Sequence, residues 1–297
     1  MKNDARRPGF WPLALVFGTF VLFLYGPVIT IFVLSFQGPE GGLTFPLRGL
    51  STHWYGELWR GLGVVDIGAA LRRSFALGFV VMALTVLLSL SAGLAFRKRL
   101  AGGQALFYVT VASLIMPSII VSLGLALQFR LLDAAIKWAL EAAGATGWLE
   151  GYTTSLGLFT SGLGAHLTWT LPFGLLIMFA VFNRFNPAYE EAARDQGATP
   201  WQTFRHVVLP LIAPSVIGIG MFGFTLSWDE VSRSSQAIGD LNTLPLELQG
   251  LTTTVTKPDI YALGTLTSAV SFLVILFALV VILILQARQR RHGSDAG

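Results

Sequence analysis

Uncharged stretches alternate with short charged segments along the whole chain. Six stretches exceed the roughly 20 residues that a helix needs, at about 1.5 Å per residue, to cross about 30 Å of hydrocarbon. They cover residues 8–39, 74–96, 100–129, 151–183, 207–228 and 260–287. Buried helices of soluble proteins need only about 10–14 apolar residues. The pattern therefore predicts an all-α membrane protein whose six transmembrane helices span about 11–36, 74–96, 105–129, 155–182, 207–228 and 262–286.

The composition agrees with this prediction and removes several classes of function. Of 297 residues, 54% are hydrophobic and only 12% are charged, which is about half the charge of a typical soluble domain. We therefore expect one membrane domain over residues 11–287 rather than two globular domains. The chain has no cysteine, which excludes disulfides, thiol catalysis and cysteine-ligated metals. No metal site is predicted.

The first uncharged stretch follows Lys2, Arg6 and Arg7, as the core of a signal peptide would. It is longer than the 7–15 apolar residues of such a core, and no A-x-A-like cleavage site follows it. We therefore expect a retained first helix.

Basic residues gather in the segments that one orientation places in the cytoplasm. With the N-terminal residues 1–10 and the tail 288–297 both inside, the inner segments hold 12 of the 20 Lys and Arg residues. They hold only 5 of the 16 Asp and Glu residues. Cytoplasmic segments carry such an excess of positive charge. We therefore predict cytoplasmic N- and C-termini, and the polar segment 186–210 also lies inside.

Residues 131–143 have the pattern of an amphipathic helix. Apolar residues recur at three- and four-residue intervals, and Asp133, Lys137 and Glu141 share another face. We expect this helix to lie along the outer membrane surface, with docking against an external partner as the alternative. Within the spans, four prolines predict kinks that serve either helix packing or a transport pathway. They are Pro27, Pro117, Pro172 and Pro214.

The segment 186–210 is predicted to form two short helices joined by a tight turn. Pro187 suits the first turn of a helix, and the two acids that follow suit its positive N-terminal end. Gly197 marks the end of that helix, where the backbone commonly needs a positive φ. Thr199-Pro200 fits the start of a second helix, which leads into the fifth span.

This segment resembles the cytoplasmic EAA loop of ABC-importer permeases. The resemblance rests on Glu191-Ala192-Ala193, Gly197 and Leu209-Pro210, with Val207 where the family usually has isoleucine. It covers nearly the whole chain and implies the type I ABC-importer transmembrane domain. It also implies that the loop binds a cytosolic ATPase through Glu190, Glu191, Ala192, Ala193, Gly197, Ala198, Phe204, Val207, Leu209 and Pro210.

The resemblance also implies the remaining parts of an uptake system in a bacterial inner membrane. This chain would be a non-catalytic subunit without a cofactor, and a separate ATPase dimer would bind ATP and Mg²⁺. A second permease subunit, predicted to be a different chain, and an external solute-binding protein would complete the system. The sequence has no G-x-x-x-x-G-K-[ST], H-E-x-x-H or G-x-S-x-G motif, which argues against an ATPase and an intramembrane enzyme. An ATP-independent carrier or channel would have no ATPase for the loop to bind.

A second polar segment bears on the solute. FTLSWDEVSRSS at residues 224–235, LPLELQ at 244–249 and HLTWTLPF around His166 resemble the spermidine/putrescine permease subfamily, in particular its second permease subunit. The resemblance implies a polyamine cargo, whose charges carboxylates along the pathway would bind. The implied pathway residues are His166, Trp228, Asp229, Glu230 and Arg233.

The sequence leaves several alternatives open at this segment. Arg233 lies four residues after Asp229, the spacing of an ion pair within a helix, or it faces an anionic solute such as a carboxylate or phosphonate. The two acids line the pathway or lie in the outer membrane interface. His166 is a packed, hydrogen-bonded side chain or a ligand-binding one.

Overall fold

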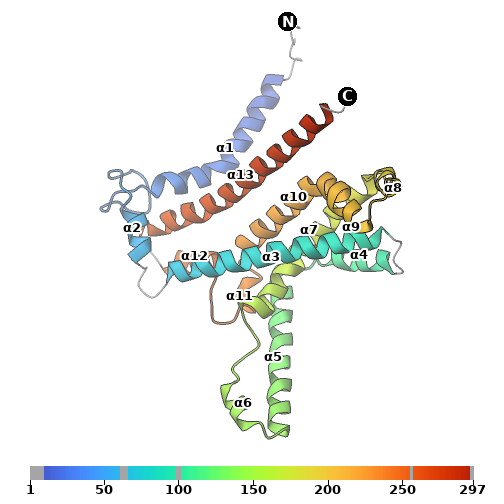
Figure 1. Cartoon of the computed structure of the whole chain (residues 1–297). Helices are drawn as coiled ribbons and strands as arrows, with labels where there is room; N and C mark the ends of the chain where they lie inside the picture. The colour runs from blue at the N-terminus through green and yellow to red at the C-terminus, as the bar shows by residue number, and fades with distance from the viewer. Residues whose placement is uncertain (1–9, 61–65, 98–101, 255–256, 295–297) are drawn as a thin grey trace. The chain divides into compact units, whose positions relative to one another are not determined.

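The computed structural model describes residues 10–60, 66–97, 102–254 and 257–294. Apart from an isolated bridge between Gln37 and Leu50, the regular structure in these residues is helical (Figure 1). The helices are α1 (Phe10–Leu34), α2 (His53–Arg60), α3 (Ile67–Phe96), α4 (Gly103–Ala112), α5 (Ser118–Ala142), α6 (Thr146–Gly151), α7 (Leu163–Arg184), α8 (Ala188–Asp195), α9 (Pro200–Thr203), α10 (Leu209–Trp228), α11 (Ser234–Ala237), α12 (Leu244–Thr254) and α13 (Asp259–Ser294). Two π-helical turns, Leu158–Gly162 and Phe204–Val208, precede α7 and α10.

Six helical segments of the described chain are long and apolar enough to cross a membrane, which confirms the all-helical, six-span prediction. They are Phe10–Leu34, Ile67–Phe96, Ser118–Ala142, Leu158–Arg184, Pro200–Trp228 and Asp259–Ile284. The second span begins seven residues earlier than predicted and includes Arg72 and Arg73. Arg73 Nε donates a hydrogen bond to the carbonyl of Asn242 at 2.7 Å, so this charge has a partner within the fold.

The third span differs most from the sequence expectation. The predicted span 105–129 contains a break: α4 ends at Ala112, and Pro117 is extended, with φ −57° and ψ 131°, before α5 begins. Proline lacks the N–H that a continuous helix needs at this position. Residues 131–142 then continue α5 without interruption. The change from apolar to amphipathic residues near 130 therefore does not start a separate surface helix.

The far end of α5 is held by one carboxylate. Asp133 accepts hydrogen bonds from the hydroxyls of Tyr152, Thr154 and Ser155 and from the backbone N–H of Ser155, at 2.5–2.7 Å. These four bonds fold the chain after α6 back along α5 (Figure 1). A carboxylate with this many donors is satisfied without a cation.

The described residues fall into two compact units. The first holds those of Met1–Ile67 and Gly250–Ala269, and the second those of Gly68–Gln249 and Val270–Gly297. In the first unit, Gln37 organises the loop after α1. Its carbonyl accepts from Trp54 Nε1 at 2.7 Å, and its side-chain oxygen accepts from the backbone N–H of Arg48 at 2.7 Å. Tyr261, near the start of α13, donates to the carbonyl of Leu43 at 2.6 Å.

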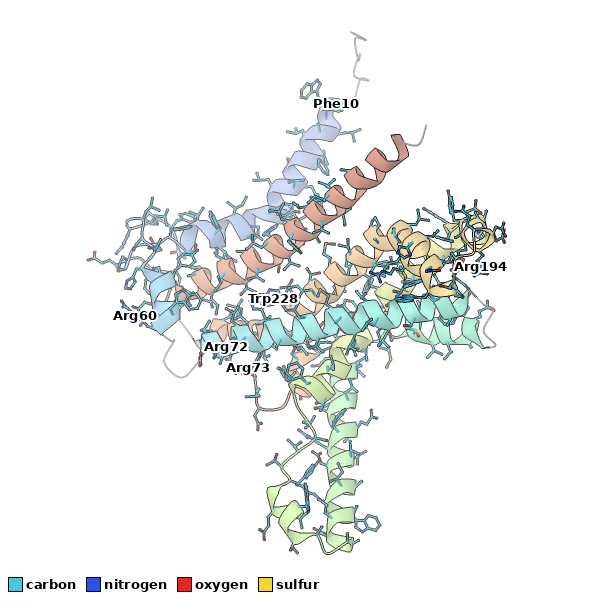
Figure 2. The ribbon with its side chains drawn as sticks, viewed as in Figure 1. Phe10, Arg60, Arg72, Arg73, Arg194 and Trp228 are labelled. Carbon is cyan, nitrogen blue, oxygen red and sulfur yellow. The ribbon has the colours of Figure 1, made fainter. Side chains whose placement is uncertain are left out.

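The second unit is built on α3, α7 and α10, which pack through small residues. A Cβ on Gly93 of α3 would lie 2.9 Å from Met178 Cβ of α7, and a Cβ on Gly223 of α10 would lie 3.2 Å from Met82 Cα of α3. Thr85 and Thr170 share a buried hydrogen bond of 2.7 Å between α3 and α7. Small residues and hydroxyl pairs are typical of helix packing in membranes. Figure 2 labels Arg194 at the α8 end of this unit and Trp228 at the opposite end of α10.

Candidate functional site

The first candidate region is the loop that carries α8 and α9. The side chain of Asn186 accepts a hydrogen bond from the backbone N–H of Ala188 at 3.1 Å, and Pro187 stands at the N-cap of α8. Gly197 follows the helix with φ +83°, the left-handed conformation that glycine adopts without strain. Its N–H donates to the carbonyl of Arg194 at 2.8 Å, and that of Ala198 donates to Ala193 at 3.1 Å. The predicted helix end at Gly197 is confirmed.

The second helix of the loop begins as the sequence indicates. Thr199 caps α9, with its hydroxyl accepting from the Gln202 N–H at 3.3 Å and its own N–H donating to the Gln202 side chain at 2.8 Å. This reciprocal pair is a capping box, and Pro200 occupies the first turn. The π-helical turn Phe204–Val208 then joins α9 to α10 without a break. The fifth span, predicted from residue 207, is therefore continuous with the second helix of the loop, which begins at Pro200 as predicted.

The residues implied for ATPase binding divide between two faces. Glu191, Ala192, Gly197 and Pro210 are exposed. Glu190, Ala193, Ala198, Phe204, Val207 and Leu209 are half-buried, and the buried residues of this segment are Thr203 and Val208. The exposed set thus lies mainly on α8 and the turn after it.

Adjacent glutamates on α8 have opposite environments. Glu190 Oε1 lies 2.7 Å from Arg97 Nη1, just beyond the end of α3, and Glu190 Oε2 lies 3.5 Å from Arg194 Nη2. The Glu190 side chain is only 15% exposed, whereas Glu191 is exposed. Neighbouring positions on a helix point about 100° apart, so one acid faces the bundle and the other faces away.

The second candidate region is the turn that follows α10. Trp228 is 1% exposed and ends the helix, with its ring 4.9 Å from that of Phe75 on α3. Asp229 is the C-cap residue and reaches the surface. The protein around this carboxylate nevertheless excludes water, and that burial raises the pKa of Asp229 above its ordinary value.

Arg233 is fully buried and forms its ion pair with Glu230, which rules out the alternative of an ion pair with Asp229 within one helix. Because α10 ends at Trp228, Asp229 and Arg233 are not one helical turn apart. Arg233 Nη1 lies 3.2 Å from Glu230 Oε2, and the Arg233 backbone N–H donates to Glu230 Oε1 at 2.8 Å. The pair places both charges inside the unit.

Arg233 also contacts two further helices, α5 and α7. Its Nη1 donates to Ser118 Oγ at 2.8 Å, and its carbonyl accepts from Ser122 Oγ at 2.7 Å, both on α5. Its guanidinium carbon lies 4.6 Å from the centre of the Trp169 ring on α7, a cation–π contact. Nε and Nη2 of Arg233 find no acceptor among the described residues.

His166 is buried beside this cluster and is satisfied within it. Its Nδ1 lies 2.8 Å from Ser227 Oγ, and its Nε2 lies 3.0 Å from Ser234 Oγ. Ser234 uses its hydroxyl hydrogen on the carbonyl of Glu230 at 2.7 Å, so His166 Nε2 donates to Ser234. In a neutral imidazole Nδ1 is then the acceptor from Ser227. His166 is thus a hydrogen-bonded core residue that ties α7 to the turn after α10.

Sequence reasoning missed the partners of the pathway candidates. They are Ser118, Ser122, Trp169, Ser227, Ser234 and, at the other end of the unit, Arg97. Two spacings carry a weak signal, because Ser118 and Ser122 lie four residues apart and His166 and Trp169 three apart, each pair on one helix face. Neither spacing indicates which helix the pair contacts.

Comparison with known proteins gives one family. Residues 85–293 match the family model of the binding-protein-dependent transport system inner membrane component. The chain is 29% identical over 253 residues to the putrescine transport system permease protein PotI of Escherichia coli, covering 82% of this chain and 81% of PotI. It is 29% identical over 271 residues to the spermidine/putrescine transport system permease protein PotC of Haemophilus influenzae, covering 91% of this chain and 94% of PotC.

Two solved structures share the fold. One is a bacterial ABC transporter involved in the import of the acidic polysaccharide alginate, with a TM-score of 0.60 and 16% identity over 95% of this chain and 96% of that chain. The other is the MetNI methionine ABC transporter, with a TM-score of 0.52 and 17% identity over 80% and 99%. The chain therefore has the type I fold of an ABC-importer membrane subunit.

Proposed function

The chain belongs to the family of binding-protein-dependent transport system inner membrane components, and we propose that it is a polyamine permease of an ATP-driven importer. It is a multi-pass inner-membrane subunit without catalysis of its own. In the proposal it forms half of a translocation pathway with a second, different permease subunit. A cytosolic ATPase dimer and an external solute-binding protein complete the importer.

The ATPase-binding role is supported by the geometry of α8. The helix presents Glu191 and Ala192 to solvent and is followed by Gly197, whose φ of +83° glycine adopts without strain. None of its eight residues, all of them described, is buried. A short helix with one small, exposed surface is suited to enter a groove on another protein.

The polyamine assignment rests on Asp229. This carboxylate reaches the surface at the end of α10 and forms no ion pair among the described residues. It is therefore available to a cationic solute, and the relatives PotI and PotC are named for putrescine and for spermidine and putrescine. Glu230, in contrast, is already neutralised by Arg233 at 3.2 Å. We assign cation attraction to Asp229 alone rather than to both acids.

Uptake of putrescine by the reconstituted importer tests this assignment. In vesicles that contain the complete importer and its binding protein, Asp229→Asn should reduce putrescine uptake about tenfold, as expected for loss of a charge-assisted contact. Glu141→Gln is the matched control, because it removes an exposed acid on the side predicted to be outside. Unchanged uptake in Asp229→Asn, with normal assembly, would contradict the cation pathway.

An anionic solute is the second candidate, and the two unsatisfied nitrogens of Arg233 favour it. Both nitrogens are buried, so a carboxylate or phosphonate would accept hydrogen bonds from them only where the transport pathway opens beside Arg233, and a polyamine would be repelled there. Mass spectrometry of the solute that co-purifies with the binding protein decides between the two. An anion there would replace the polyamine assignment.

The predicted orientation is part of the proposal and has its own test. Because the chain has no cysteine, single cysteines report accessibility without background. Substitutions at Gly144 and Asn242 should be labelled by an impermeant reagent from outside, and those at Gly103 and Thr199 only after permeabilisation. Labelling of Thr199→Cys from outside would exclude contact between the loop and a cytosolic ATPase.

A further inference from the structure

Arg97 holds three elements together at the base of α8. It follows the last residue of α3, and its Nη1 lies 2.7 Å from Glu190 Oε1 on α8. The guanidinium carbon also lies 4.9 Å from the ring centre of Phe182 and 5.1 Å from that of Phe185, at the end of α7. The Arg97 side chain is 24% exposed, so this contact is partly shielded from solvent and salt.

This ion pair attaches α8 to the bundle, beside a ring contact of 6.3 Å between Tyr189 of α8 and Phe185. None of the eight described residues of α8 is buried, so apolar packing holds the helix weakly. Beneath the loop lies a cavity of about 810 Å³, and its lining includes Leu94, Arg97, Phe182, Glu190 and Val208. An ion pair beside a cavity, rather than close apolar packing, therefore attaches the helix to the bundle.

Helix α3 leads from Arg97 to the other end of the unit. Phe75 of α3 contacts Trp228 with ring centres 4.9 Å apart, next to Asp229. The 22 residues between Phe75 and Arg97 span about 33 Å of helix. No proline occurs in α3, whereas α7 and α10 contain Pro172 and Pro214. Because proline weakens a helix at its position, α3 is the stiffest direct connection between the two ends.

We propose that Arg97 is a positioning residue that transmits movement of α8 to α3 through its ion pair with Glu190. This inference rests on the proposed ATPase-binding role of α8. The two adjacent acids then have different roles: Glu191 contacts the ATPase, and Glu190 connects α8 to the membrane helices. It also adds a second route to the covalent one through α9 and α10, which includes the turn at Gly197.

The test is ATP hydrolysis by the reconstituted importer, with and without binding protein that was purified with its native cargo. Arg97→Ala should retain the ATPase on co-purification but lose most of the stimulation by the binding protein, at least about fivefold, the lower range for coupling between sites. Arg97→Lys should retain part of it, because lysine keeps the charge and loses the planar contact with the two rings.

Exchanging the charges of Arg97 and Glu190 tests whether the effect comes from their mutual contact. Arg97→Glu and Glu190→Arg should each abolish stimulation, and the two together should restore it to within about twofold of the wild-type value, as expected for directly coupled residues. Arg194→Ala is the matched control: it removes a charge 3.5 Å from the same carboxylate, but its side chain is 59% exposed. That variant should keep full stimulation.

Two outcomes overturn the inference. Full stimulation in Arg97→Ala would show that the pair transmits nothing. Loss of ATPase retention in Arg97→Ala, the result expected for charge reversal of the exposed Glu191, would place Arg97 in the docking surface. If Arg97→Ala fails to insert or is polydisperse, Arg97→Lys and the reversed pair decide by the same stimulation assay. A wild-type importer that retains no ATPase would instead refute the proposed function, so the two failures are distinguishable.

Discussion

The two charged regions of the second unit use the same kinds of side chain in opposite ways. At α8, Glu190 is paired with Arg97 and approached by Arg194, and the basic side chains are 24% and 59% exposed. After α10, Arg233 is fully buried, and its partners are Glu230, serine hydroxyls and an aromatic ring. The two acids are similarly buried, with Glu190 15% and Glu230 10% exposed, so the regions differ in their basic side chains, which are partly exposed in the first region and fully buried in the second.

The difference in exposure predicts how substitutions in each region affect stability. Partly exposed ion pairs contribute little to stability, because water and salt screen them. A buried charge is costly unless every neighbouring dipole is in place, so removal of one member leaves the others unpaired. We therefore expect the α8 region to tolerate substitution structurally while losing function. The region after α10 should lose stability first.

The largest effect should come from Arg233→Ala. It leaves Glu230, whose side chain is only 10% exposed, without its cation and also removes the bond to Ser118. The free energy of unfolding should fall by about 3 kcal/mol, the lower end for breaking a buried ion pair. Arg194→Ala should change it by less than about 1 kcal/mol. Thermal unfolding of both variants in detergent measures the contrast, and equal shifts would break the comparison.

His166→Phe should be the next largest. The substitution keeps the volume roughly constant but leaves the hydroxyls of Ser227 and Ser234 without their ring partner, and both serines are buried. Two lost hydrogen bonds should lower the free energy of unfolding by about 2 kcal/mol. His206→Phe is the control, because His206 is exposed and its ring lies 3.1 Å from the carbonyl of Gln202 within its own helical segment. Thermal unfolding should show no change in that variant, and a loss as large as that of His166→Phe would contradict the prediction.

The α8 region could be predicted almost residue by residue because its signals are local. Gly197 has the expected positive φ, and Thr199-Pro200 has the expected cap. These positions are set by interactions within four residues of the chain. The environment of Glu190 was not predicted, since its partner Arg97 is 93 positions away in the sequence.

The region after α10 could not be predicted for the same reason. Ser118 and Arg233 are 115 positions apart, and His166 and Ser234 are 68 apart. Which helices pack together decides these contacts, and no periodicity within one helix encodes it. A helical pair of Asp229 and Arg233 would need a helix that continues beyond Trp228, but α10 ends at that residue, where the fifth span was predicted to end.

Gly197→Val tests whether a substitution in the α8 region reduces ATPase binding without preventing insertion. A Cβ at this position meets nothing within 4 Å, so the cost comes only from φ +83°, about 1–2 kcal/mol for a side-chain-bearing residue. Co-purification of the ATPase should fall several-fold while insertion stays normal. Gly197→Asn should retain most binding, because asparagine adopts this conformation readily. Equal loss in both variants would assign the effect to side-chain contact rather than backbone strain.

The smallest effect is a pH dependence at Asp229, where burial raises the pKa above the ordinary value of 3.8. The folded protein then binds a proton more tightly than the unfolded chain, so stability falls as pH rises from 3.8 through the raised pKa. Asp229→Asn removes this cost. The variant should unfold at a slightly higher temperature than the wild type at pH 7, and the difference should vanish below pH 3.8. Putrescine uptake should instead fall as pH falls, because only the ionised carboxylate attracts a cation. Uptake by the wild type should therefore decline as pH drops through the raised pKa of Asp229. The Asp229→Asn variant should keep a low uptake at every pH. Thermal unfolding and uptake measured across the same pH series check both signs, and a wild-type stability that rises with pH relative to the variant would contradict the raised pKa.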